Sequence, residues 1–191
     1  EVLVRVEYCG ICGSDRHAIA SGDWIEYWPA ILGHEAVGVV EESVDPAIRI
    51  GERVVIDSRR PCEQCALCRR GARGLCESLT WMGESAPGGY AEYVLADPNY
   101  VGILPKNVDF LEIAPILCAG VTVYKGLKET GARPGQWVAI SGIGGLGHVE
   151  AVALEVGAQD TPDRRLVVHH QHTWHGCSLV VRRPTPSLPA A

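Results

Sequence analysis

The sequence predicts an α/β protein with a large β component, and three patterns lead to this prediction. The first is "EVLVRVEYCG" at the N-terminus, where apolar residues alternate as they do along a strand with one buried face. The second is "GHEAVGVV" from residue 33, an apolar run that is typical of a strand following a turn. The third is "GQWVAISGIGGLGHVEAVALEVGA" from residue 135, which predicts a strand, a glycine-rich turn and a helix in succession.

Length and composition are those of a folded protein whose partner is a small molecule. The 191 residues suffice for one domain and part of a second, with 47% hydrophobic and 21% charged residues. A net charge of -6 without a long basic run argues against a nucleic-acid surface, and no apolar run approaches the length of a membrane span.

The start of the chain carries a prediction about its location and its extent. The first residues lack the basic start, long apolar stretch and cleavage site of a signal peptide, so we expect a cytoplasmic protein. The one methionine is Met82, from which we expect this chain to begin partway into a longer translation product.

Half of the eight cysteines lie in "CEQCALCRRGARGLC", which starts at residue 62. Four thiolates on a short loop can converge tetrahedrally on one zinc, whereas disulfides between cysteines three residues apart strain most local geometries. A disulfide-stapled loop is the alternative, and the missing secretory signal disfavours it. A closed shell of four sulfurs has no open position, so this zinc would be structural. The predicted ligands are Cys62, Cys65, Cys68 and Cys76.

Three further candidate ligands come from distant segments of the chain. Cys12 lies in the glycine-punctuated turn after the first strand, His34 at the head of the second, and Cys118 where a helical pattern begins. Taken singly, a buried cysteine or histidine is more often part of a core. Together, soft and borderline ligands from three segments are typical of a catalytic zinc, which keeps one position open for substrate.

The glycine pattern Gly142-x-Gly144-x-x-Gly147 has the context that a dinucleotide site needs. It follows the predicted strand at residues 137–141 and opens the predicted helix, so its glycines would let a pyrophosphate approach the helix N-terminus.

The motifs that carry a family resemblance occur in one order along the chain: "CGICGSDRH", "SGDW", "GHEAVGVV", the four-cysteine array, "GGYAEYV", "LCAGVTVYKGL" and "SGIGGLGH". From Glu1 to about Gly157 the chain resembles the zinc-dependent alcohol dehydrogenases of the medium-chain dehydrogenase/reductase family. The resemblance implies a GroES-like β-barrel catalytic domain followed by a Rossmann-type domain, truncated here. It implies two zinc ions per chain, NAD or NADP as cofactor, and a homo-oligomeric parent, a tetramer or a dimer.

The expected domains follow from this resemblance. Residues 1–115 are the GroES-like domain with its structural zinc lobe at about 60–80, and residues 116–158 are a linker helix and the first strand–turn–helix of the Rossmann-type domain. Residues 159–191 are a divergent tail, expected to be poorly ordered, because Pro162 and the charges around it do not suit a buried strand.

The resemblance also implies roles for individual residues in a reaction that interconverts an alcohol and an aldehyde or ketone by hydride transfer. The implied catalytic zinc ligands are Cys12, His34 and Cys118, with Glu35 able to enter the shell and Asp15 orienting the histidine. Ser14 would take the alcohol proton and His17 would pass it on. Trp24 is implied as a pocket wall, although core packing is an equal alternative. The implied cofactor-binding residues are Thr122, Gly142, Gly144, Gly145, Leu146 and Gly147.

After Ala158 the resemblance ends, and a segment dense in possible metal ligands follows. It contains His169, His170, His172, His175 and Cys177. Composition by itself is a weak signal, and both zinc sites are already supplied elsewhere, so we do not predict a metal site in the tail. A changed reading frame or a fused end would account for the abrupt loss of the family pattern.

Two alternatives to an alcohol dehydrogenase remain open on the sequence. A polyol or amino-alcohol dehydrogenase of the same superfamily shares both zinc patterns. A catalytically silent zinc-binding fragment would keep the ligands without turnover.

Overall fold

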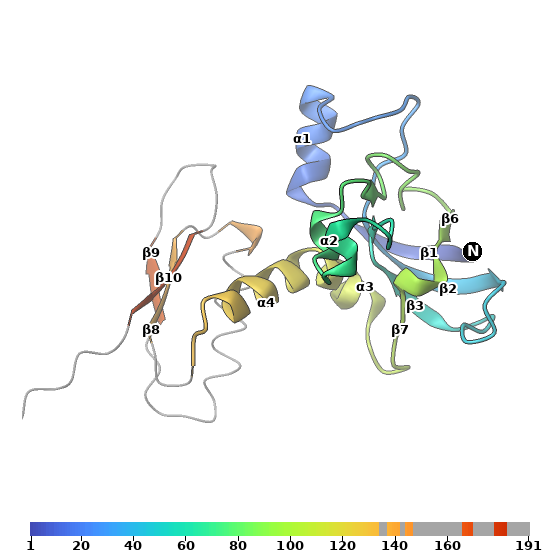
Figure 1. Cartoon of the computed structure of the whole chain (residues 1–191). Helices are drawn as coiled ribbons and strands as arrows, with labels where there is room; N and C mark the ends of the chain where they lie inside the picture. Colours follow the sequence, from blue (N-terminus) through green and yellow to red (C-terminus); the bar gives the residue numbers. More distant parts are fainter. Residues whose placement is uncertain (134–136, 142–143, 147–165, 170–177, 183–191) are drawn as a thin grey trace, which may run out of the picture. The chain divides into compact units, whose positions relative to one another are not determined.

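The computed structural model describes residues 1–133, 137–141, 144–146, 166–169 and 178–182, and the chain divides into two units, Glu1–Cys118 and Ala119–Ala191 (Figure 1). The strands of the first unit are β1 (Val2–Gly10), β2 (Glu35–Ser43), β3 (Arg53–Ile56), β4 (Arg59–Arg60), β5 (Thr80–Trp81), β6 (Tyr93–Ala96) and β7 (Val101–Ile103). Its helices are α1 (Gly13–Ser21), α2 (Ala66–Arg69), α3 (Phe110–Ile113) and the 3-10 turns η1 (Arg73–Leu75), η2 (Pro98–Tyr100) and η3 (Ala114–Leu117).

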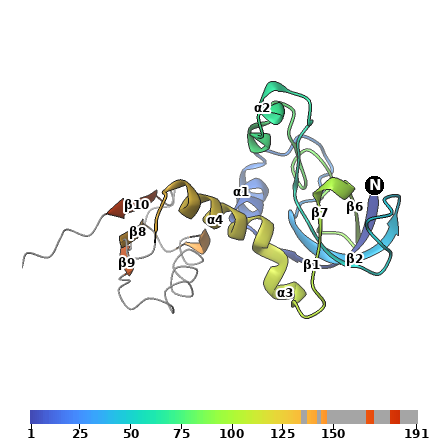
Figure 2. The ribbon, with the colours of Figure 1, turned by 60° about the horizontal axis from the view of Figure 1, so that its bottom comes forward.

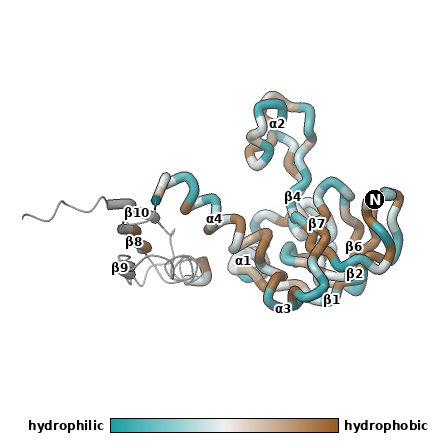
Figure 3. The backbone as a smooth tube through the Cα atoms, turned by 90° about the horizontal axis from the view of Figure 1, so that it is seen from below, coloured by the Kyte–Doolittle hydropathy of each residue, from teal (hydrophilic) through white to brown (hydrophobic). Residues whose placement is uncertain are grey.

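Five strands of the first unit form one antiparallel sheet in the order β6-β1-β2-β3-β7. Figure 2 labels four of them, β1, β2, β6 and β7. β4 and β5 pair separately, and between them the chain leaves the sheet as the loop that carries α2, which Figure 3 shows extending away from the strands. The strands predicted at the N-terminus and after residue 33 are confirmed as β1 and β2. The sheet-rich first unit agrees with the expected GroES-like domain.

The central strand β2 is buried on both faces, which explains why its sequence is an almost unbroken apolar run. One face, with Ala36 and Val40, belongs to the main core. The other face places Val37 in a second cluster with Val55 and Ala114. The main core consists of Val2, Val4, Ala36, Val40, Ile48, Val54, Ile56, Met82, Val94 and Ala96.

The second unit contains helix α4 (Ala119–Glu129) and strands β8 (Trp137–Ser141), β9 (Leu166–His169) and β10 (Ser178–Arg182). β8 is the middle strand, parallel to β9 and antiparallel to β10. Two strands, β9 and β10, thus lie within residues 159–191. Each is a short run rich in valine and leucine.

Among the residues that the structure describes, no single helix is long and apolar enough to cross a bilayer, although the bent pair Phe110–Leu117 and Ala119–Glu129 together passes the length and composition test.

The close approach of β1 and β2 depends on Gly38. A Cβ atom at this position would lie 2.0 Å from the carbonyl oxygen of Arg5 on the neighbouring strand. We expect Gly38→Ala to destabilise the fold by about 1–3 kcal/mol, because backbone atoms have to move apart. Chemical denaturation of the purified chain measures this. Gly74→Ala is the matched control, since nothing lies within 4 Å of the added Cβ. Equal midpoints for the two variants would contradict the expectation.

Candidate metal centres

Cys12 and His34 meet because β1 and β2 are antiparallel neighbours. The ladder pairs Gly10 at the end of β1 with Glu35 at the start of β2. Cys12 follows β1 by two residues and caps the N-terminus of α1, while His34 directly precedes β2. A Cβ on Gly10 would lie 2.0 Å from Glu35 Oε2, so glycine leaves the space that the Glu35 carboxylate occupies. Cys12, which follows β1, and His34, which precedes β2, therefore lie at the same edge of the sheet.

Cys118 reaches the same place through packing of the segment that precedes it. Phe110 and Ile113 of α3 and Leu117 of η3 pack against the second apolar cluster around Val37 and Val55. The loop before α3 is held by Arg53, whose guanidinium donates hydrogen bonds to the carbonyl oxygens of Pro105 (3.0 Å), Lys106 (2.8 Å) and Val108 (2.5 Å) and stacks 3.9 Å above the Phe110 ring. Burial of an apolar helix face and a fixed loop thus place Cys118 beside β2.

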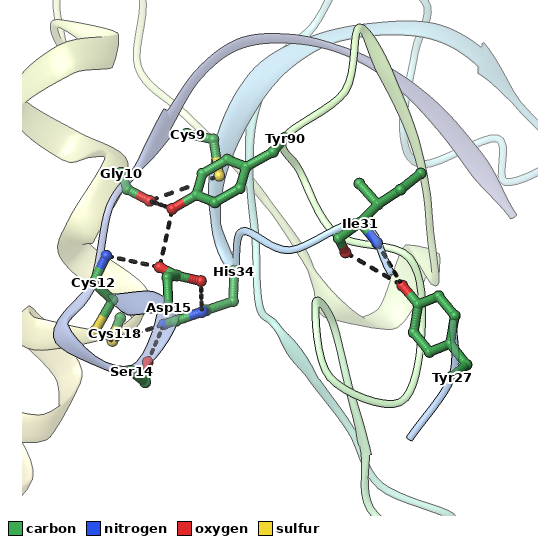
Figure 4. A network of polar contacts seen from close by, with 10 residues as sticks. All are labelled: Cys9, Gly10, Cys12, Ser14, Asp15, Tyr27, Ile31, His34, Tyr90 and Cys118. Carbon is green, nitrogen blue, oxygen red and sulfur yellow. Dashed lines mark hydrogen bonds and ion pairs between the residues drawn. The ribbon is translucent and has the colours of Figure 1, made fainter. Parts of the chain in front are cut away.

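Four possible metal ligands lie together at this edge of the sheet, and we name Cys12, His34, Glu35 and Cys118 the mixed-ligand cluster. One ligand atom from each residue lies within 4.8 Å of the others. The Sγ atoms of Cys12 and Cys118 are 3.8 Å apart, and Cys118 Sγ is 3.6 Å from His34 Nε2 (Figure 4). A tetrahedral zinc, with Zn–S of about 2.3 Å and Zn–N of about 2.05 Å, separates two sulfurs by about 3.8 Å and a sulfur and a nitrogen by about 3.6 Å. The donor set and its spacing fit zinc.

Asp15 is buried beneath His34 and fixes its ring. Its Oδ1 lies 3.3 Å from His34 Nδ1, so it accepts that N–H and turns Nε2 toward the two sulfurs. Its Oδ2 accepts hydrogen bonds from the backbone N–H of Cys12 (2.8 Å) and from the hydroxyl of Tyr90 (3.0 Å). The contact between Asp15 Oδ1 and His34 Nδ1 is the one that the expected orienting role of Asp15 requires.

The residues of the mixed-ligand cluster have pKa values that are shifted in different directions. Hydrogen bonds from Cys118 and His34 lower the pKa of the Cys12 thiol to about 3. The hydrogen bond to Asp15 raises the pKa of His34 to about 10, and the neighbouring Cys12 raises the pKa of the Cys118 thiol. Burial raises the pKa of Glu35. A metal that binds here has to displace protons from His34 and Cys118, so its affinity increases with pH.

Ser14 and His17, the expected proton relay, lie on α1 with different surroundings. Ser14 Oγ is 3.4 Å from His34 Nε2, directly at the cluster. His17 is half exposed, its Nε2 is 3.4 Å from Asp23 Oδ2, and its ring lies 4.5 Å from that of Trp24. Trp24 is 55% exposed, which argues against the alternative that it packs in the core.

The second group of ligands is the four-cysteine cluster, formed by Cys62, Cys65, Cys68 and Cys76. The four sulfurs lie within 4.8 Å of one another on the loop around α2. Backbone N–H groups point at the sulfurs: Cys62 N–H at Cys76 Sγ (3.3 Å), Cys65 N–H at Cys62 Sγ (3.4 Å) and Cys68 N–H at Cys65 Sγ (3.4 Å). Such donors stabilise thiolates, and four thiolates on one short loop suit a closed zinc shell.

The thiols of this cluster differ in their surroundings. Hydrogen bonding from the Cys68 N–H lowers the pKa of Cys65 to about 6, whereas burial raises the pKa of Cys68 to about 12. Glu63, inside the array, accepts hydrogen bonds from Arg73 (2.8 Å) and from the Tyr100 hydroxyl, and so ties the loop to the end of η2. All seven cysteines in the described part of the chain are free thiols, not disulfides.

The other candidate residues that the structure describes lie outside these two clusters. Thr122 is on α4 of the second unit, and Gly144, Gly145 and Leu146 are exposed after β8. Outside the described residues lie Gly142, Gly147, His170, His172, His175 and Cys177. His169 ends β9.

Tyr90 also belongs to this site, through the hydrogen bond that its hydroxyl donates to Asp15. It lies inside the quoted motif "GGYAEYV", 75 residues from its partner Asp15. Its hydroxyl reaches Asp15 because the backbone of residues 88–90 pairs with residues 31–33. Only the motif itself could have drawn attention to it, since the contact is entirely tertiary.

Comparisons with known proteins identify the family of this chain. Residues 1–106 match the model of the alcohol dehydrogenase GroES-like domain. The chain is 49% identical over 192 residues to an alcohol dehydrogenase of Geobacillus stearothermophilus, covering 95% of this chain and 56% of the relative. It is 47% identical over 176 residues to an alcohol dehydrogenase of Moraxella sp., covering 87% of this chain and 52% of the relative. The chain thus spans about half the length of these relatives.

Solved structures are similar over the same extent. The alcohol dehydrogenase of Aeropyrum pernix superposes with a TM-score of 0.74 at 32% identity, covering 88% of this chain and 51% of that chain. A zinc-binding dehydrogenase of Sinorhizobium meliloti 1021 bound to NADP gives a TM-score of 0.79 at 31% identity, covering 87% of this chain and 48% of that chain.

The four-cysteine cluster can be tested by removing one sulfur. We expect Cys65→Ser to release about one metal equivalent and to loosen the loop around α2, because metal binding and local folding are coupled. Elemental analysis and limited proteolysis measure the two effects. Cys9→Ser is the control, since Cys9 belongs to neither cluster. Unchanged metal content in Cys65→Ser would contradict the assignment of the four cysteines as ligands of one metal ion.

Proposed function

The chain belongs to the family of alcohol dehydrogenases that share the GroES-like domain, and from this we propose that it supplies the zinc-binding part of an NAD(P)-dependent alcohol dehydrogenase. Such an oxidoreductase interconverts an alcohol and an aldehyde or ketone by transferring a hydride to or from the nicotinamide. A GroES-like domain and similar alcohol dehydrogenases over nearly the whole chain support the oxidoreductase class.

The observation that carries this proposal is the mixed-ligand cluster. Two of its separations, Cys12 Sγ to Cys118 Sγ and Cys118 Sγ to His34 Nε2, match those between corners of a zinc tetrahedron. Three protein ligands leave the fourth corner for a substrate oxygen, which is the pattern of a catalytic site. We propose that Cys12, His34 and Cys118 hold this zinc, with Glu35 beside them as an occasional fourth ligand.

The chain's own residues would move the substrate proton. A zinc ion at this site would lower the pKa of a bound alcohol hydroxyl, as it does for water. Ser14, whose Oγ lies 3.4 Å from His34 Nε2, is close enough to the open corner to take that proton. His17 lies one helical turn further and is half exposed, so it can pass the proton to solvent.

The proposal also assigns residues to a substrate pocket and to a cofactor site. Trp24, which contacts His17, would line the pocket and favour small alcohols. NAD or NADP would use the turn after β8, where nothing lies within 4 Å of a Cβ added to Gly144 or Gly145, so the backbone is open to a phosphate. We propose Thr122 as a residue facing the nicotinamide, and a cytoplasmic homo-oligomer as the parent protein.

A chimera tests the proposed function. Residues 1–141 of this chain would replace the matching segment of the Geobacillus stearothermophilus alcohol dehydrogenase, which it matches at 49% identity. We expect the chimera to oxidise short primary alcohols, and Ser14→Ala to lower kcat by about 10²–10⁴-fold through loss of proton transfer. Absorbance of the reduced cofactor measures the rate, and Ser78→Ala is the control. A folded chimera that holds both metals and oxidises no alcohol would contradict the proposal.

The 191-residue chain alone gives a second test. Hydride transfer requires the nicotinamide to be fixed close to the alcohol, and this chain spans about half the length of its relatives. We expect the purified chain to retain zinc but to show no turnover near the ordinary rate of about 1 per second. Zinc analysis and the cofactor assay with NAD and NADP measure both. Turnover at an ordinary rate would mean that this chain completes a cofactor site by itself.

A further inference from the structure

We infer that Tyr90 is a positioning residue for metal binding at the mixed-ligand cluster. Its hydroxyl holds Asp15, and Asp15 in turn keeps a proton on His34 Nδ1 and leaves Nε2 for the metal. The inference rests on the proposed zinc site and adds to it a residue that touches no ligand directly.

The hydrogen bonds around Asp15 carry the argument. Both oxygens of this carboxylate are engaged, since Oδ1 faces His34 Nδ1 at 3.3 Å and Oδ2 accepts from Cys12 N–H at 2.8 Å and from Tyr90 at 3.0 Å. The Tyr90 hydroxyl is also 3.1 Å from the Gly10 carbonyl oxygen. The Tyr90 hydroxyl has one proton to donate, and the charged Asp15 carboxylate is a stronger acceptor than the Gly10 carbonyl. The hydroxyl therefore donates to Asp15.

Because Asp15 is buried, each of its hydrogen-bond partners contributes to its orientation. Asp15 is 3% exposed, so water cannot easily replace a donor that is removed. Without the tyrosine hydroxyl, Oδ2 keeps only the Cys12 N–H, and the carboxylate is less firmly held in the orientation that His34 requires. A histidine whose ring orientation or tautomer varies binds metal less tightly.

The backbone holds Tyr90 in register with the residues before His34. Gly88 N–H donates to the Ile31 carbonyl (2.7 Å), Gly89 N–H to Gly33 (2.7 Å) and Tyr90 N–H to Leu32 (3.0 Å). The ring lies against Gly33, where an added Cβ would be 2.6 Å from Tyr90 Cδ1. Tyr90 is thereby fixed next to the residue that precedes His34, and Figure 4 shows its hydroxyl directed at Asp15.

The ring of Tyr90 is not a core side chain. The residue is 38% exposed, although its hydroxyl is directed inward. Replacement by phenylalanine keeps the ring contacts and removes only the hydroxyl. Its effect therefore reports on the hydrogen bond to Asp15.

The test is metal affinity of the 191-residue chain with Tyr90→Phe, titrated with Co²⁺ against a chelator. Four sulfurs and a mixed sulfur and nitrogen shell give different cobalt spectra, so the two clusters are followed separately. We expect affinity at the mixed-ligand cluster to fall about tenfold, as for loss of one hydrogen bond to a charged group, with a shift of its cobalt bands. Affinity at the four-cysteine cluster should stay unchanged.

Two further variants separate positioning from general damage. Tyr93→Phe removes another hydroxyl from an exposed tyrosine on β6 and should change neither cluster. In an Asp15→Asn background, Tyr90→Phe should have little further effect, because it acts through Asp15.

The outcomes are distinguishable. Two bound metals in the unsubstituted chain with equal affinity in Tyr90→Phe would overturn this inference alone. Weakening of both clusters, or an undiminished effect in the Asp15→Asn background, would show a general structural role and also overturn it. An unsubstituted chain that binds metal only at the four-cysteine cluster would overturn the proposed zinc site and this inference together.

Discussion

Antiparallel pairing of β1 with β2 places Gly10 opposite Glu35, and this register determines which side chains meet beyond the two strands. Because successive residues of a strand alternate between faces, a slip of β1 by one residue would turn Val2 and Val4 away from the main core. It would also move His34 away from the turn that carries Cys12. The core residues Val2, Val4, Ala36 and Val40 hold the register, so the stability of the sheet and the geometry of the mixed-ligand cluster have one origin.

Apolar packing on the second face of β2 positions Cys118, the remaining cysteine of the mixed-ligand cluster. Cys118 is 84 residues from His34 in sequence, and the segment before it is positioned by burial of Ala114 and Leu117 against Val37 and Val55. Arg53 contributes from β3 by holding the loop at Pro105 and Val108. The mixed-ligand cluster is thus assembled by apolar packing on one strand and aligned by a buried carboxylate, Asp15.

The sequence could predict which candidate ligands the structure brings together, because their chemistry is local in each segment. A cysteine array, or a histidine at the head of an apolar run, is visible without knowing the fold. The role of Tyr90 was not predictable in this way, since a tyrosine in a glycine-rich turn has many ordinary roles and its contact with Asp15 requires the tertiary structure. The pairing of the short valine-rich strands β9 and β10 with β8 joins segments distant in sequence, so it is likewise not visible in any local pattern.

The spacing of the ligands along the chain has a consequence for the order in which the protein assembles. Cys62 and Cys76 are 14 residues apart, so the four-cysteine loop can close at small entropic cost before the sheet exists. Cys12 and Cys118 are 106 residues apart and meet only after β1, β2 and α3 have packed. During folding, a metal ion at the four-cysteine cluster would therefore bind an almost unfolded chain. A metal ion at the mixed-ligand cluster would bind only after most of the first unit has folded.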